Sequence, residues 1–290
     1  MSMNNKFLVI IVLTLVTMAF LFGGCTGKVV PSSDSGANVT SESVNPSESA
    51  DASANVQVIT IGVDDTYPPM EFRDEQNNLV GFDVDLATAL GEKLNVKFEY
   101  KSVAWDGIFE GLKSGNYDCI ISSVSMTPDR LETFDFTKPY LANGQVIVVK
   151  PGDTSIKTSA DLVGKVVGVQ VNTTADTAVT KQQDTVKFDV KRYDEIIQTF
   201  DAMNAGVIDC IVVDYAVAID YQAKYPEKYV ITTAQLTNEP IAICFKKGSE
   251  LRDKFQTALD QVKADGKLTE LSKKWFGGED FTSNINENLY

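Results

Sequence analysis

The pattern LKSGNYDCI at residues 112–120 returns as MNAGVIDCI at residues 203–211. Each copy reads as the end of a helix, a glycine and the start of a buried strand. A shorter match links IGV at residues 61–63 to VGV at residues 167–169. Together the two matches predict two lobes that are built alike.

Short β-type runs alternate with amphipathic stretches around these matches. One stretch has an apolar residue at every fourth position, which indicates a helix with one buried face: Phe82, Leu86, Leu90 and Leu94. Residues 58–63, 97–100, 119–121 and 166–169 read as strands, and residues 105–113 read as a helix that ends near Gly115. This alternation favours an α/β fold with mainly parallel sheets.

The composition narrows the class of function. The chain has 290 residues, of which 40 are acidic and 26 are basic, so its formal net charge is −14. Phosphate neutralisation needs clustered Lys and Arg, so we expect no nucleic-acid partner. The sequence contains no histidine, which excludes Ser-His-Asp and Cys-His catalysis and most zinc sites. We expect no metal and no cofactor.

The first 55 residues are predicted to be a secretion signal followed by a tether. Residues 1–24 combine one lysine, a long apolar run and two final glycines, which is typical of a secretory signal peptide. The segment LFGGC that ends at Cys25 resembles a bacterial lipobox, although Phe22 stands where such motifs usually have leucine. The resemblance implies that Cys25 carries lipid, including palmitate. Residues 25–55 are rich in serine and predict a flexible tether.

Three further cysteines lie in apolar, strand-like runs: Cys119, Cys210 and Cys244. A free cysteine in such a run behaves as a small hydrophobic residue. Three is an odd number, so no complete set of disulfides exists, although a Cys119–Cys244 bridge stays open.

Several motifs follow one another in a fixed order: IGVDDTYPPMEF at 61–72, GFDVDL at 81–86, WDG at 105–107, SSVSMTPDR at 122–130, FDFTKPY at 134–140 and GKLTELSKKWFG at 266–277. In this order they resemble the solute-binding proteins of polar-amino-acid ABC transporters, family 3. The resemblance covers about residues 58–278. It implies a two-lobed periplasmic-binding-protein-like fold of type II, with a ligand cleft between lobes that two crossing strands join and that close like a hinge.

The same resemblance implies the domain boundaries. Lobe 1 is expected to comprise residues 56–143 and 238–290, and lobe 2 residues 144–237. Monomer is the state that the family implies.

A free amino acid needs a fixed cation for its carboxylate and a fixed anion for its ammonium group. Arg130 can donate two charge-assisted hydrogen bonds to a carboxylate, and it stands at the family's carboxylate-binding arginine. Asp214 ends an apolar strand and matches the family's ammonium-binding aspartate, although it could also cap the helix that follows. Ser123 and Ser125 match positions that bind the ligand backbone.

Thr173 matches a position that meets the ligand carboxylate at the start of a helix. The family usually has glycine at or next to Val171, where this chain reads VNTT at residues 171–174.

Four residues match positions that line the family's side-chain pocket: Asp64, Tyr67, Trp105 and Ser122. The two aromatic residues could sandwich a long or cationic side chain. Asp64 could accept hydrogen bonds from its far end. An aromatic slot that ends in an acid favours lysine, arginine or histidine, and glutamine remains open because an amide also donates to a carboxylate.

We therefore expect a protein that performs no catalysis, captures a polar and basic amino acid, and delivers it to the permease subunits of an ABC importer. The lipid would hold it on the extracellular face of the cell membrane or in the periplasm. Glutamine or another polar amino acid is the alternative ligand. Two other functions compete: a cyclohexadienyl-dehydratase-like enzyme, in which Asp64, Asp65, Glu71 or a lysine would be the general acid, and a sensor domain.

Overall fold

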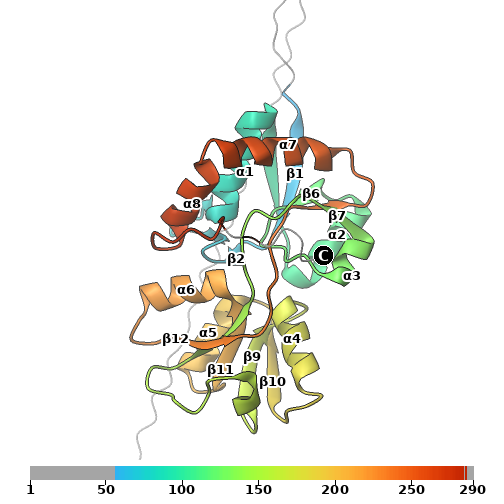
Figure 1. Ribbon diagram of the computed structural model, residues 1–290. Helices are drawn as coiled ribbons and strands as arrows, with labels where there is room; N and C mark the ends of the chain where they lie inside the picture. The colour runs from blue at the N-terminus through green and yellow to red at the C-terminus, as the bar shows by residue number, and fades with distance from the viewer. Residues whose placement is uncertain (1–55, 284, 286–290) are drawn as a thin grey trace, which may run out of the picture. The chain divides into compact units, whose positions relative to one another are not determined.

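The computed structural model describes residues 56–283 and 285 (Figure 1). The predicted signal peptide, the predicted lipidation site at Cys25 and the predicted tether all lie outside the described residues. No helix in the described part of the chain is long and apolar enough to cross a membrane.

Lobe 1 is built on a five-stranded sheet in the order β5-β1-β6-β13-β7. Its strands are β1 (Val58–Val63), β5 (Lys97–Ser102), β6 (Cys119–Ile120), β7 (Phe134–Phe136) and β13 (Cys244–Lys246). One face carries α1 (Phe82–Leu94), α7 (Leu251–Ala264) and α8 (Lys267–Trp275), as Figure 1 shows. The other face carries η1 (Trp105–Gly107), α2 (Ile108–Ser114) and α3 (Pro128–Thr133). The helix predicted from the four-residue spacing is α1, and its Phe82, Leu86 and Leu90 are fully buried.

Lobe 2 is built on a second five-stranded sheet, in the order β10-β9-β11-β8-β12. Its strands are β8 (Gln145–Val149), β9 (Val166–Gln170), β10 (Asp189–Tyr193), β11 (Cys210–Asp214) and β12 (Val230–Gln235). Helix α4 (Thr174–Gln182) and η2 (Ser159–Leu162) pack on one face. Helices α5 (Ile196–Asn204) and α6 (Tyr215–Lys224) pack on the other.

The two sheets have the same topology, as the internal repeat predicts. In each sheet three adjacent strands are parallel, the fourth is antiparallel to its neighbours, and the fifth is antiparallel to the fourth. Four strands of each sheet therefore run in one direction, and β13 or β8 runs against them. Strand β1 corresponds to β9, and β6 corresponds to β11, which are the strands that hold the repeated sequences.

Matching hydrogen bonds reinforce this correspondence. The backbone N–H of Asp118 donates to Thr60 O at 2.9 Å, and its carboxylate accepts from Thr60 N at 2.7 Å. At the repeated position, Asp209 makes the same two bonds with Val166, at 2.8 and 2.7 Å. The repeat therefore encodes the join between a helix end and the opening of a strand in both lobes.

Two crossing segments connect the lobes, as the resemblance implies. They run antiparallel, with Tyr140 N donating to Ile241 O at 2.8 Å and Glu239 N donating to Asn143 O at 2.9 Å. Figure 1 shows them side by side between the two sheets. The domain boundaries at residues 143/144 and 237/238 stay a prediction. A small antiparallel sheet in lobe 1 completes the fold and consists of β2 (Thr66–Tyr67), β3 (Glu71–Arg73) and β4 (Leu79–Val80).

The cysteines Cys119, Cys210 and Cys244 are free and buried. In the pairing of β6 with β13, Cys244 lies opposite Ile120 and Phe245 lies opposite Cys119. Side chains of neighbouring residues point to opposite faces of a sheet, so Cys119 and Cys244 belong to different cores. The Cys119–Cys244 bridge that the sequence left open does not form.

Candidate functional site

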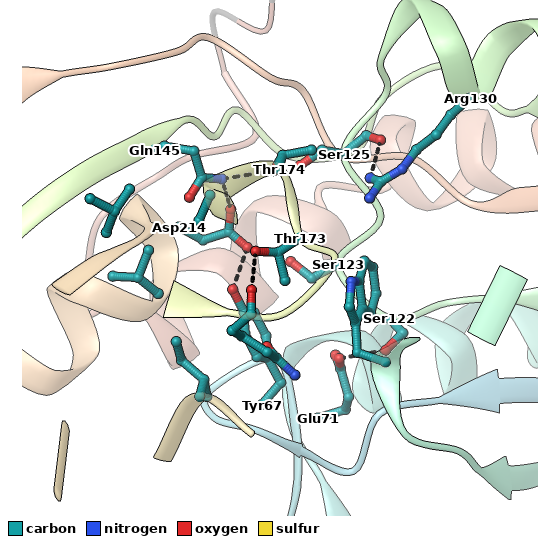
Figure 2. Close-up of a pocket in the computed structure, with 16 residues that line it drawn as sticks. Tyr67, Glu71, Ser122, Ser123, Ser125, Arg130, Gln145, Thr173, Thr174 and Asp214 are labelled. Carbon is teal, nitrogen blue, oxygen red and sulfur yellow. Dashed lines mark hydrogen bonds between the residues drawn. The ribbon is translucent and has the colours of Figure 1, made fainter. Parts of the chain in front are cut away.

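A pocket between the two lobes is lined by side chains from both. It contains about 400 Å³ of space outside protein atoms, counting space that opens to solvent. Figure 2 shows polar groups converging on it from opposite sides. The lining residues are Tyr67, Glu71, Trp105, Ser122, Ser123, Ser125, Arg130, Gln145, Gln170, Thr173, Thr174, Ala175, Ile196, Val212, Val213 and Asp214. Eight of the nine predicted binding residues are among them, and Asp64 is the exception.

Arg130 supplies the positive charge of this pocket. It belongs to α3, whose N-cap Thr127 accepts a hydrogen bond from the Arg130 backbone at 3.2 Å. Its guanidinium donates from Nη1 to Ser125 O at 2.9 Å and lies over the Phe109 ring, 4.6 Å from the centroid. Among the described residues it makes no ion pair with a carboxylate. The remaining donors of the guanidinium are therefore available to an anion that enters the pocket.

Asp214 supplies a negative charge on the side of lobe 2. It stands at the N-cap position of α6, but its side chain makes no capping bond there. Its carboxylate instead accepts hydrogen bonds from Tyr67 Oη, Asn143 Nδ2 and Gln145 Nε2, each at 2.6 Å. Burial raises the pKa of Asp214, and the donated bonds oppose that rise. In the part of the chain that the structure describes, no cation pairs with this carboxylate.

Four buried side-chain atoms lack a hydrogen-bond partner among the described residues, and all four belong to residues that line the pocket: Glu71 Oε2, Ser123 Oγ, Gln145 Oε1 and Gln170 Oε1. Buried polar atoms in folded proteins are almost always paired. Their gathering around one space indicates that a polar molecule completes the pairing.

The three predicted serines lie in the segment after β6, but they differ in how they are engaged. The Ser122 hydroxyl donates to Glu71 Oε1 at 2.7 Å and accepts from Asp64 N at 2.9 Å, so protein groups occupy it. Ser123 has a left-handed backbone with φ of 49° and a hydroxyl without a partner. Ser125 uses its carbonyl to hold Arg130. Among the described residues, the hydroxyls of both Ser123 and Ser125 are thus free for a ligand, and that of Ser122 is not.

Thr173 caps α4 at the edge of the pocket. Its hydroxyl accepts from Asp176 N at 3.2 Å and donates to Gln170 O at 2.8 Å. Because the hydroxyl is engaged in this way, the groups left for an anion are the first backbone N–H groups of the helix, which have no intrahelical acceptors.

Asn172 follows Val171, at or next to which the resemblance implies a glycine. It adopts a left-handed backbone with φ of 57°, which asparagine tolerates better than other non-glycine residues. Its carbonyl accepts from Trp105 Nε1 at 3.1 Å, which joins lobe 2 to lobe 1. The loop therefore approaches lobe 1 closely without glycine.

Asp64 lies beside the pocket, behind Gln170. Its carboxylate accepts from Thr66 Oγ1 at 2.6 Å and from Gln170 Nε2 at 2.8 Å. Burial raises the pKa of Asp64, while these bonds oppose the rise. In this arrangement Gln170, and not Asp64, presents its side chain to the pocket. Tyr67 spans the lobes through its bond to Asp214.

Residues 59–278 match the model of the bacterial extracellular solute-binding proteins, family 3. The chain belongs to this family.

Relatives of this solute-binding protein differ in the amino acids that their names specify. It is 34% identical to the ABC transporter arginine-binding protein 1 of Escherichia coli K12, over 75% of this chain and 90% of the relative. It is 32% identical to the L-cystine-binding protein TcyJ of the same strain, over 76% of this chain and 83% of the relative. It is also similar to the solved structure of an ancestral arginine-binding protein bound to arginine, with 40% identity, a TM-score of 0.72 and coverage of 76% and 98%. The solved structure of an ancestral arginine-binding protein bound to glutamine is similar as well, with 40% identity and a TM-score of 0.71.

Sequence reasoning did not place four polar residues of this solute-binding protein in the pocket: Glu71, Gln145, Gln170 and Thr174. Glu71 was considered only as a general acid of the competing enzyme. A signal exists for Gln145, since it is the one polar residue of the strand QVIVV, whose five residues are all buried. Gln170 similarly ends the apolar strand β9.

Proposed function

We propose that this protein captures a free amino acid for an ABC importer, with the ligand's α-carboxylate on Arg130 and its α-ammonium group on Asp214. One observation carries the proposal: a half-buried arginine without an acidic partner and a buried aspartate without a cationic partner line one pocket in the described structure. Unpaired buried charges are costly, and a zwitterion that pairs with both removes that cost.

Ser123 and the start of α4 would complete the grip on the ligand's backbone. The Ser123 hydroxyl lacks a partner, and the first turn of α4 directs backbone N–H groups at the same end of the pocket as Thr173. Tyr67 and Trp105 would flank the ligand's side chain.

We further propose a basic ligand, lysine, arginine or histidine, with glutamine as the alternative. Around the side-chain end of the pocket the described groups are Glu71 and, behind Gln170, Asp64. The relative named as arginine-binding, and the ancestral arginine-binding proteins solved with arginine and with glutamine, support the same pair of candidates. An acidic lining favours a cation over an amide because the charges attract in a site with little water.

We also propose a cellular location and an oligomeric state for the protein. A signal peptide at residues 1–24, lipid on Cys25 and a tether over residues 25–55 would present a monomer on the outer face of the membrane, next to its permease. The lipobox-like segment that ends at Cys25 supports this. Labelled palmitate should enter the wild-type chain in a bacterial host and not Cys25→Ser.

We propose that the protein does no chemistry on its ligand. The acids beside the pocket are held by neighbouring donors: Thr66 and Gln170 on Asp64, Ser122 on Glu71, and three donors on Asp214. Recovery of any bound amino acid unchanged after long incubation checks this, and conversion of a cyclohexadienyl acid would contradict it.

A thermal-shift panel of the twenty amino acids tests the function. At a ligand concentration one hundred times its Kd, binding adds about 2.7 kcal/mol to the free energy of unfolding. We expect a subset that includes basic amino acids to stabilise the full chain, and Asp214→Asn to lose most of this shift. Asp220→Asn, in the same lobe but bound to Lys224 outside the pocket, is the matched control and should keep it. If none of the twenty amino acids stabilises the chain, the proposal is wrong.

A further inference from the structure

Two buried carboxyl groups meet in lobe 1 beside the pocket. Glu71 opens β3, and Asp83 lies in the first turn of α1. The backbone brings them together, since Asp83 N donates to the carbonyl of Met70 at 2.9 Å. Each residue is 1% exposed, and the two side chains lie within hydrogen-bonding reach of each other. Only Glu71 of the two lines the pocket.

Successive residues of one loop hold both groups. Ser122 Oγ donates to Glu71 Oε1 at 2.7 Å, and Ser123 N donates to Asp83 Oδ2 at 2.7 Å. Tyr140 Oη donates to Asp83 Oδ1 at 2.8 Å. Of the four carboxyl oxygens, Glu71 Oε2 alone has no donor. If that oxygen carries a proton, it donates to Asp83 and every oxygen is satisfied.

The surroundings favour such a proton. The titratable groups that face the pair are Asp64 after β1, Tyr67 on β2, Tyr100 on β5 and Tyr140 in a crossing segment. None of these is a cation. Burial raises the pKa of Asp83 to about 6, and burial together with Asp83 raises the pKa of Glu71 well above its usual range.

We propose that Glu71 and Asp83 share one proton and adjust the charge of the pocket to the ligand. A neutral side chain binds with the proton in place. A cationic side chain takes over as the partner of Glu71, and the proton leaves to the solvent. This proposal rests on the proposed capture of an amino acid, and it adds a proton exchange that distinguishes basic ligands from neutral ones.

The position of Glu71 makes the exchange possible. Its carboxyl group lines the pocket and also contacts Asp83. A ligand charge that lies beside Glu71 therefore acts directly on the protonation of both carboxyl groups. With the shared proton the pair carries one negative charge. A ligand cation at Glu71 stabilises the second negative charge, which two adjacent carboxylates cannot hold without help.

The first experiment needs no ligand. Side-chain carboxyl ¹³C resonances of the full chain are followed by NMR as the pH changes, in the wild type and in Glu71→Gln. We expect one carboxyl of the pair to stay protonated well above pH 4 in the wild type. In Glu71→Gln the titration step of Glu71 should vanish, while the pKa of Asp83 stays raised because burial is its main cause. Titration of both wild-type carboxyl groups near their ordinary values would overturn the proposal.

The second experiment counts protons on binding. Arginine and glutamine are titrated calorimetrically into the full chain at pH 6.5 in phosphate and in bis-Tris, whose ionisation enthalpies differ. The wild type should release up to one proton with arginine and none with glutamine. Glu71→Gln should release none and should bind arginine at least about tenfold more weakly, while its affinity for glutamine changes by less than about threefold.

A matched control separates the pair from burial in general. Asp220→Asn replaces another buried acid, which pairs with Lys224 outside the pocket, and it should keep the wild-type proton count. Equal proton release by the wild type and Glu71→Gln would overturn the exchange. A chain that retains the shared proton in the NMR experiment but binds no amino acid would refute the proposed function instead, and leave the proton-sharing pair established.

Discussion

The two lobes share a framework and differ where their strands end. Gly62 and Gly168 occupy equivalent positions in the corresponding strands β1 and β9. Asp118 and Asp209 make the same pair of hydrogen bonds in the two lobes. Shortly after the repeated sequences the residues diverge: Asp64 corresponds to Gln170, and Ser123 corresponds to Asp214.

The two lobes therefore contribute different chemical groups to the pocket. Lobe 1 brings the cation Arg130 and the acid pair Glu71–Asp83. Lobe 2 brings Asp214, two glutamines and the start of α4. The interior of a lobe fixes where strand ends lie, and the residues at those ends decide what is bound. Four changes can break or sharpen this comparison.

The largest effect is expected from the cation of lobe 1. Arg130→Ala leaves a ligand carboxylate in a buried site without its partner, so binding should weaken by about 2–5 kcal/mol. Calorimetry with the best amino acid of the thermal panel measures it. Arg252→Ala is the control, because Arg252 pairs with Asp253 on α7, away from the pocket. Equal losses in the two variants would remove Arg130 from the site.

The next effect is a pH dependence that lobe 1 dominates. Burial raises the pKa values of Asp64, Glu71 and Asp83, so between about pH 4 and pH 6 the folded chain binds more protons than the unfolded chain. The free energy of unfolding of the ligand-free protein should therefore fall as the pH rises through this window, by up to about 3 kcal/mol.

Denaturant titrations at several pH values measure this slope. Glu71→Gln should flatten it. If Asp214→Asn in lobe 2 reduces the slope more than Glu71→Gln does, the pair of Glu71 and Asp83 is not the main source of the pH dependence.

The framework glycines test how alike the lobes are. A Cβ on Gly62 would lie 2.5 Å from Tyr117 Cε2, in a ring whose hydroxyl is fixed by Ile108 O. A Cβ on Gly168 would lie 2.3 Å from Ile208 Cδ1, the end of a movable side chain. Both alanine variants should lose stability by overpacking, about 1–3 kcal/mol, with Gly62→Ala losing more. Ile208→Val should rescue Gly168→Ala in denaturant unfolding, and a missing rescue would contradict the contact.

The smallest effect concerns the loop of lobe 2. Asn172 has a left-handed backbone, so Asn172→Ala should lower stability by about 1 kcal/mol, whereas Asn172→Gly should change it by a few tenths. Thermal unfolding of the three proteins compares them. Equal losses for alanine and glycine would mean that the asparagine side chain, rather than its backbone, matters.

Local pattern predicted the framework well. The spacing of Phe82, Leu86 and Leu90 located α1, and the repeat predicted two similar lobes. The spacing within α1 and each copy of the repeat involve residues that are close together in the sequence. The antiparallel β8 and β13 were not anticipated, because their direction follows from where the chain crosses between the lobes.

The site was predicted less completely, because its pairs join distant residues. Arg130 and Asp214 could be recognised from motifs, and both line the pocket. The link between Gln145 and Asp214 spans 69 residues, and the contact of Glu71 with Asp83 depends on how β3 meets α1. No local pattern contains that information. Asp64 was expected to face the ligand, and the bond from Gln170 holds it one layer behind.

That bond joins the ends of two corresponding strands, β1 and β9. A molecule with two identical halves would place like against like at this point. Two aspartates would repel each other, whereas an aspartate and a glutamine are acceptor and donor. Loss of symmetry at this one residue position therefore replaces a repulsive pair of aspartates with a hydrogen-bonded pair across the lobes.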